Sequence, residues 1–114
     1  MRKKIITALA ILTASLGAGS AAYAECSGKA CKNVKVERLY VRNNPTILIS
    51  TTGDEAALNC LPVEGRYIEL RAAHQKYDEI YSLLLAAKLA DHNIWIRVRN
   101  APQSPCSILY VVLE

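Results

Sequence analysis

Hydrophobic residues follow two different periods along this chain. Apolar and polar side chains alternate through residues 34–41, 66–71 and 94–99, which is the period of a β-strand with one buried face. Residues 47–49 form a short apolar run, and residues 108–113 are apolar on both faces. We therefore predict five strands at these positions.

The first predicted strand changes its apolar face midway. Val34 and Val36 share one face, whereas Leu39 has the opposite parity. A bulge or a sharp bend in a strand produces such a shift. The polar residues 25–33 before it are predicted to form a loop, and the turn signal at 43–45 predicts that the first two strands form a hairpin.

One helix is predicted between the third and fourth strands. Residues 73–91 are rich in Leu, Ala, Lys and Glu and contain neither Gly nor Pro. Five residues at helical spacing form the predicted core-facing stripe: Tyr77, Ile80, Tyr81, Leu84 and Ala87. Three more leucines widen the apolar surface, and either loops or another subunit would cover them. Leu83, Leu85 and Leu89 are therefore candidates for an oligomer interface.

The order of these elements is β-β-β-α-β-β, which is the order of an OB-fold. In that fold a five-stranded, partly open barrel is plugged at one end by its helix. A bent first strand agrees with it, because a small barrel needs a strand that coils between two sheet regions. We expect a mainly β domain with one helix and an OB-fold-like barrel. An open antiparallel sheet with one packed helix is the alternative.

The first 24 residues have the three parts of a secretory signal. Three cations precede an apolar run over residues 5–16, and small residues occupy Ala22 and Ala24, as the cleavage rule requires. The run is shorter than the roughly 20 residues of a membrane span. We expect a cleavable signal peptide at 1–24, a single domain at 25–114, and a periplasmic or secreted protein without a stable membrane anchor.

Net charge gives little indication of an anionic partner. The chain has 14 Lys and Arg against 10 Asp and Glu, but three of those cations, Arg2, Lys3 and Lys4, lie in the predicted signal. Residues 25–114 therefore have a net charge of +1. A charge this small, together with the absence of Phe, argues against nucleic-acid binding.

All four cysteines lie in the predicted domain: Cys26, Cys31, Cys60 and Cys106. An even number in a small exported domain indicates two disulfide bonds. Three pairings can be drawn. We favour Cys26–Cys31, which share a short polar loop, with Cys60–Cys106, which join the middle of the domain to its last strand. Zinc is the alternative, but there is no C-x-x-C and neither histidine is near a cysteine in sequence. We expect no metal and no cofactor.

No catalytic residues are predicted. The chain has no nucleophile elbow, H-E-x-x-H or glycine-rich phosphate loop, and its cysteines are expected to be oxidised. His74 and His92 are near opposite ends of the helix, about 27 Å apart at 1.5 Å per residue. Asp78 and Glu79 are adjacent and point in different directions. We therefore expect that the protein is not an enzyme.

The candidate binding residues are Trp95, Arg97 and Arg99. They alternate with Ile94, Ile96 and Val98, so they lie on the opposite face of the strand. An exposed indole beside guanidinium groups stacks on a sugar ring or anchors a protein partner. The alternative is that Trp95 packs against its own domain or a neighbouring subunit.

The C-terminal half, residues 66–113, resembles the B subunit of subtilase cytotoxin and its small exported relatives. Three segments carry the resemblance: Tyr77-x-x-Ile80-Tyr81-Ser82-Leu83-Leu84-Leu85-Ala86-Ala87-Lys88, Ile94-x-Ile96-x-Val98 and Cys106-x-Ile108-x-Tyr110. The resemblance implies an OB-fold and, from the toxin members, a pentameric ring that binds cell-surface glycans and carries a catalytic A subunit. These segments are mostly core positions, so no sugar-binding residue is transferred to this chain.

We therefore expect an exported, non-catalytic binding module that recognises a glycan or a protein, with a homo-oligomer such as a pentamer as its assembly. A monomeric periplasmic inhibitor or a structural envelope protein is the alternative. An assembly of five copies and a monomer differ in mass, which makes the two readings easy to separate.

Overall fold

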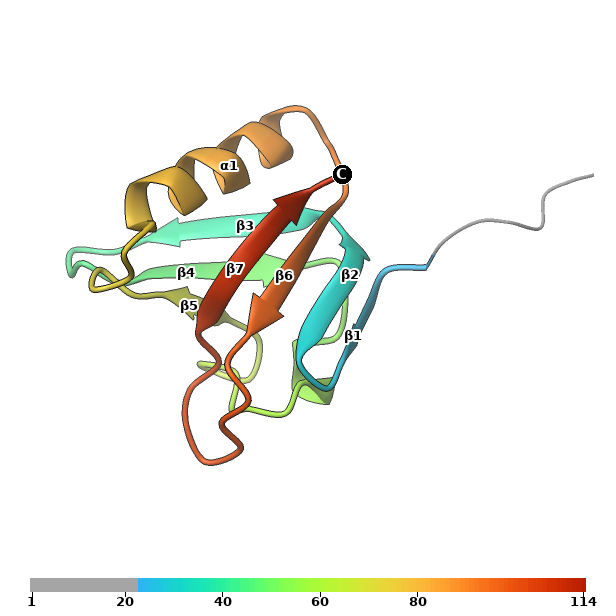
Figure 1. The fold of residues 1–114 in the computed structure, drawn as a ribbon, viewed down its shortest axis with the longest axis vertical. Helices are drawn as coiled ribbons and strands as arrows, with labels where there is room; N and C mark the ends of the chain where they lie inside the picture. Colours follow the sequence, from blue (N-terminus) through green and yellow to red (C-terminus); the bar gives the residue numbers. More distant parts are fainter. Residues whose placement is uncertain (1–22) are drawn as a thin grey trace, which may run out of the picture.

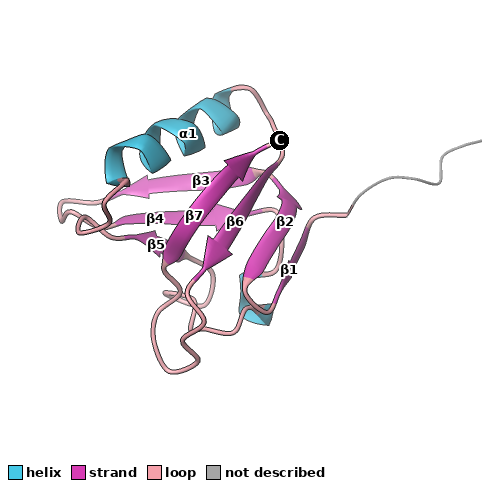
Figure 2. Cartoon of the chain, viewed as in Figure 1, coloured by secondary structure: helices cyan, strands magenta, loops and turns pink. Residues whose placement is uncertain are grey.

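The computed structural model describes residues 23–114, and nearly all of the predicted signal peptide lies outside them. The described chain is mainly β with one α-helix (Figures 1 and 2). A single 3-10 turn, Glu55–Ala57, follows the fourth strand. The strands and the helix, in chain order, are β1 (Glu25–Ser27), β2 (Ala30–Val34), β3 (Val36–Val41), β4 (Ile47–Thr51), β5 (Ile68–Leu70), α1 (Tyr77–Leu89), β6 (Ile94–Val98) and β7 (Ile108–Leu113).

The strands form two antiparallel sheets, with the orders β1-β2-β6-β7 and β3-β4-β5. The predicted bend in the first strand is confirmed, because β2 belongs to one sheet and β3 to the other, with the break at Lys35. Asn33, with a φ of 54°, lies where the register between β2 and β6 shifts, and Asn tolerates this left-handed conformation better than most residues. The predicted hairpin is also confirmed, as the antiparallel pair β3 and β4.

The prediction of a loop at residues 25–33 is wrong, because these residues form the hairpin of β1 and β2. Cys26 and Cys31 lie opposite each other and are buried, whereas the residues between them and around them are mostly polar. The buried positions of the hairpin are thus Cys26 in β1 and Ala30, Cys31 and Val34 in β2. Gly28, with a φ of 61°, makes the turn.

The helix α1 is shorter than predicted, because residues 73–76 form turns instead. Its predicted stripe is confirmed: Ile80, Leu84 and Ala87 are buried in the core, and Tyr77 and Tyr81 pack against it. Two polar contacts also attach the helix to the hairpin of β3 and β4. The Tyr77 hydroxyl donates to the Pro45 carbonyl at 2.8 Å, and the Lys88 ammonium donates to the Glu37 carbonyl at 3.0 Å.

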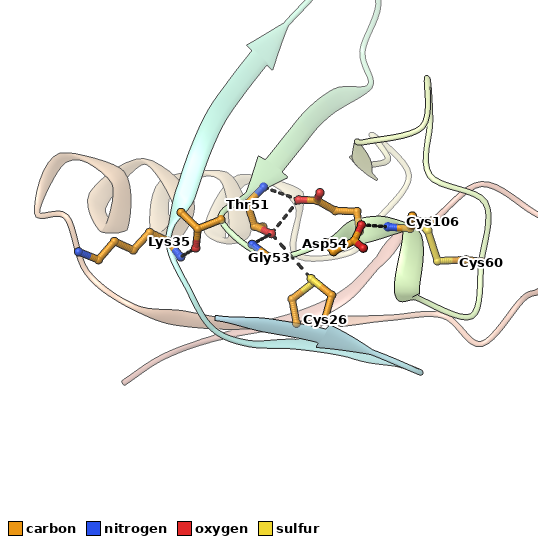
Figure 3. The surroundings of a disulfide bond; sticks show 11 residues. Cys26, Lys35, Thr51, Gly53, Asp54, Cys60 and Cys106 are labelled. Carbon is orange, nitrogen blue, oxygen red and sulfur yellow. Dashed lines mark hydrogen bonds between the residues drawn. A yellow bond between two sulfur atoms is a disulfide. The ribbon is translucent and has the colours of Figure 1, made fainter. Parts of the chain in front are cut away.

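The two favoured disulfides, Cys26–Cys31 and Cys60–Cys106, are both present. The second encloses a much longer loop, so the chain-entropy model assigns it roughly 4 kcal/mol against roughly 2 kcal/mol for the first. Near the first bond, Cys26 Sγ lies 3.8 Å from Thr51 Oγ1 (Figure 3). The Thr51 hydroxyl in turn donates to the buried carboxylate of Glu55 at 2.7 Å. This carboxylate is thus part of the local fold.

The two sheets approach each other where β5 meets the beginning of β7. Glu69 and Ser107 form a single parallel bridge, and the Glu69 N–H donates to the Cys106 carbonyl at 2.8 Å. This short contact does not close the two sheets into a barrel. The mainly β class with one helix is therefore established, and the five-stranded OB-fold barrel stays a prediction.

Candidate binding face

The outward surface of the four-stranded sheet carries the strongest candidate binding residues. Ile94, Ile96 and Val98 are almost fully buried, so Trp95 and Arg97 project to the opposite side of β6. On β7, Val112 is the partner of Trp95 and Tyr110 is the partner of Arg97. We call this surface, together with Lys32 of β2, the binding face: Lys32, Trp95, Arg97, Tyr110 and Val112.

Trp95 is the centre of the binding face. The Lys32 ammonium lies over its indole, 4.7 Å from the ring centroid, a cation–π contact of about 0.5–1 kcal/mol at an exposed site. Trp95 remains partly exposed, and Tyr110 is 43% exposed beside it. Among residues 23–114, neither Lys32 nor Arg97 is in an ion pair. The face thus presents aromatic rings and cations that form no ion pair, although Glu25 of β1 lies opposite Lys32.

The three predicted binding residues do not share one surface. The register between β6 and β7 shifts between Arg97 and Val98. Arg99 follows this shift, and its N–H donates to the Ser107 carbonyl at 3.0 Å. Its side chain lines a separate hollow with Arg71 and His74. Trp95 and Arg97 are therefore together, and Arg99 belongs to another site.

The three leucines proposed for an oligomer interface differ in exposure. Leu83 is half-buried, Leu85 is 37% exposed and Leu89 is 79% exposed. Strand β7 adds exposed apolar surface, although its apolar sequence suggests a strand buried on both faces. It lies at the edge of its sheet, and four of its six residues are exposed: Leu109, Tyr110, Val112 and Leu113.

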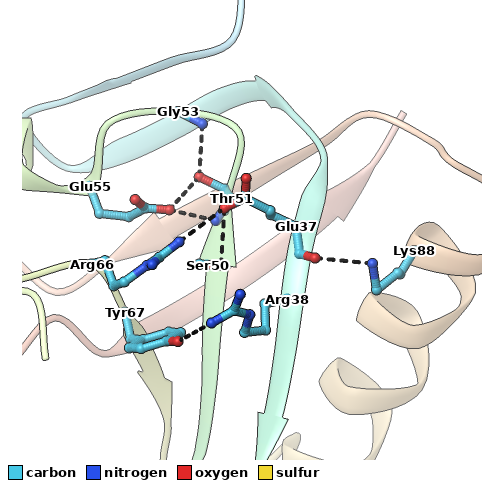
Figure 4. A network of polar contacts seen from close by, with 9 residues as sticks. All are labelled: Glu37, Arg38, Ser50, Thr51, Gly53, Glu55, Arg66, Tyr67 and Lys88. Atoms are coloured by element: carbon cyan, nitrogen blue, oxygen red, sulfur yellow. Dashed lines mark hydrogen bonds and ion pairs between the residues drawn. The ribbon is translucent and has the colours of Figure 1, made fainter. Parts of the chain in front are cut away.

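The outward surface of the other sheet also combines arginine with tyrosine. Arg38 Nη1 donates to the Tyr67 hydroxyl at 3.0 Å, and this hydrogen bond raises the pKa of the Arg38 guanidinium above its ordinary value. The centroids of the Tyr40 and Tyr67 rings are 5.7 Å apart. Glu37 accepts from Ser50 and pairs with Arg66 at 3.5 Å (Figure 4). We call this surface of β3, β4 and β5 the tyrosine face.

Both histidines contact backbone carbonyl oxygens at the two ends of β7. His74 Nε2 lies 2.8 Å from the Leu109 carbonyl oxygen, and His92 Nε2 contacts the carbonyl oxygen of Glu114. They thus join the two ends of the helical segment to opposite ends of β7. Between residues 23 and 114 there is no group of three side chains placed to hold a metal ion, and no helix there has the length and apolar character of a membrane span.

Comparison with protein-family models gives no match, and comparison with curated protein sequences gives none either. The candidate site therefore depends on the geometry of the two faces.

Proposed function

We propose that this chain is an exported, non-catalytic binding module that recognises a glycan or a protein through the binding face. The observation that carries the proposal is the partly exposed indole of Trp95 beneath the Lys32 ammonium, with Arg97 on the same strand and Tyr110 on the adjoining β7. Trp, Tyr and Arg are the residues most enriched at binding hot spots. An indole that is solvated on one side can stack on a sugar ring or insert into a partner.

The contact between β5 and β7 supports an OB-fold-like barrel as the finer architecture. An OB-fold is partly open, and its strand order places the helix between the third and fourth strands. Here α1 lies between β5 and β6, which is that place when β2 and β3 count as one bent strand and the short β1 is set aside. Glu69 and Ser107 bring the ends of the two sheets together. The two disulfides support export to an oxidising setting, the periplasm or the medium.

Exposed apolar residues support the further proposal of a homo-oligomer, with a toxin-like pentamer as its form. Leu85 and Leu89 on α1 are exposed, as are Leu109 and Leu113 on β7. Size-exclusion chromatography with light scattering tests this with protein purified after expression of the full chain. A mass near five copies agrees with the pentamer, and a mass of one copy contradicts it and favours the monomeric inhibitor.

The binding proposal is tested by a glycan array, followed by calorimetric titration of any glycan that binds. We expect Trp95→Ala to weaken binding at least tenfold, the loss typical of a hot-spot tryptophan. Tyr40→Ala is the matched control, because it removes an exposed aromatic residue from the tyrosine face. It should change affinity less than twofold.

The binding proposal fails if Trp95→Ala binds as tightly as the original protein while circular dichroism shows the same fold. It also fails for glycans if the array shows no ligand.

A further inference from the structure

A hollow of about 270 Å³ lies where the ends of three strands meet. Its lining residues are Arg71, Ala73, His74, Arg99, Ser107 and Ile108. Two backbone hydrogen bonds fix the strand ends around it: Glu69 N–H donates to the Cys106 carbonyl at 2.8 Å, and Arg99 N–H donates to the Ser107 carbonyl at 3.0 Å. The Cys60–Cys106 disulfide holds the residue next to Ser107. The hollow is therefore formed by rigid parts of the fold.

His74 forms a fixed wall of this hollow. The Lys76 N–H donates to His74 Nδ1 at 2.9 Å, so that nitrogen acts as an acceptor. The other nitrogen, Nε2, then carries the proton and donates it to the Leu109 carbonyl at 2.8 Å. Both ring nitrogens are thus engaged with the protein. The imidazole shapes the hollow, and the ligand-binding groups must come from its other residues.

Two guanidinium groups line the same hollow. Arg71 uses only its Nε for Glu69, at 2.5 Å, so its terminal nitrogens remain available. Arg99 has no carboxylate partner within residues 23–114. An anion bound in the hollow would meet both arginines, of which only Arg71 already has a carboxylate beside it, that of Glu69. Ser107 is only 2% exposed and adds a hydroxyl to the lining.

We propose that this hollow binds a carboxylate, held by the terminal nitrogens of Arg71 and Arg99 and by the Ser107 hydroxyl. Arginine presents its N–H groups as a planar fork that matches the two oxygens of a carboxylate. Ala73 and Ile108 give the hollow an apolar wall for the carbon next to the carboxyl group. The inference rests on the proposed function in one respect, that the carboxylate belongs to the ligand recognised by the nearby binding face.

The test is an NMR titration of the ¹⁵N-labelled protein, purified after expression of the full chain, with sodium acetate as the probe and neutral acetamide as its uncharged counterpart. Acetate should cause saturable shifts at the amides of Arg99 and Ser107, and acetamide should not. Arg99→Gln should weaken acetate binding at least fivefold. Arg66→Gln is the matched control, since it removes an arginine of the tyrosine face that lies outside the hollow, and it should change affinity less than twofold.

Two further probes distinguish the source of the carboxylate. Glucuronate represents a sugar acid, and a short peptide with a free C-terminus represents a protein, with the amidated peptide as its control. Tighter binding of either probe than of acetate, lost in Arg99→Gln, supports the site and identifies its ligand. The carboxylate site is overturned if the probes shift the amide signals of the Arg99→Gln protein as much as those of the original protein. It is also overturned if the shifts are spread over all surface cations.

The failure of this inference is distinguishable from the failure of the proposed function. If acetate binds at Arg99 but the glycan array and Trp95→Ala give no effect, the carboxylate site stands and the binding face is wrong. If a ligand depends on Trp95 but neither that ligand nor acetate depends on Arg99, the binding face stands and the carboxylate site is wrong.

Discussion

The tyrosine face and the binding face are made of the same kinds of residue and differ in how these are engaged. On the tyrosine face, Tyr67 is 4% exposed and its hydroxyl accepts from Arg38, while Glu37 balances Arg66. On the binding face, Trp95 is partly exposed and Arg97 has no ion-pair partner among residues 23–114. The two faces therefore differ in part. Tyr67 and Arg66 are engaged within the domain, whereas Tyr40 is exposed beside Arg42, whose guanidinium lies 5.8 Å from its ring centroid, much as Trp95 is beside Lys32.

The two faces differ because a cation of the tyrosine face is paired with a carboxylate and the cations of the binding face are not. A cation near a surface carboxylate gains little energy but keeps a fixed geometry, as in the Arg66–Glu37 pair. Lys32 and Arg97 lack such a pair within the described chain and lie beside exposed apolar area from Tyr110 and Val112. A partner that covers this area gains hydrophobic burial and new polar contacts together.

Tyr67→Ala gives the largest effect that separates the two faces. We expect it to lower the free energy of unfolding by about 3 kcal/mol, because a buried ring leaves a cavity when it is removed. Ligand affinity, measured where the variant is still folded, should be unchanged. Urea denaturation followed by far-ultraviolet circular dichroism measures the first quantity. A variant with the original stability would show that Tyr67 is not part of the folded core.

Trp95→Ala should give a smaller loss of stability, about 1 kcal/mol, since its ring is less completely buried than that of Tyr67. The same denaturation experiment measures it. A loss as large as that of Tyr67→Ala would contradict the distinction between the faces, because Trp95 would then be a core residue whose effect on binding follows from unfolding.

Much of this fold could be predicted from the hydrophobic pattern. The period of two identifies β6, and the helical stripe from Tyr77 to Ala87 identifies the buried side of α1. The phase shift between Val36 and Leu39 coincides with the irregular register of β3 against β4 between Val36 and Arg38. The passage from one sheet to the other lies just before it, at Lys35. The hydrophobic pattern does not predict the hairpin of β1 and β2, because the sequence around its two buried cysteines is mostly polar.

The candidate sites were only partly predictable. Trp95 and Arg97 follow from alternation, but Arg99 lies beyond the end of β6 and lines another hollow. Tyr110 could not be placed on the binding face, since an apolar strand does not reveal that it lies at the edge of a sheet. Lys32 joins Trp95 only through the pairing of β2 with β6, which joins residues distant in sequence.

The intrinsic fluorescence of Trp95 tests the central claim most directly, because Trp95 is the only tryptophan of the chain. When a ligand is titrated, we predict that the emission changes with the same midpoint as the calorimetric binding curve and that acrylamide quenches the bound protein less than the free protein. Saturable binding that leaves both the emission and the quenching unchanged would place the ligand elsewhere and contradict the account.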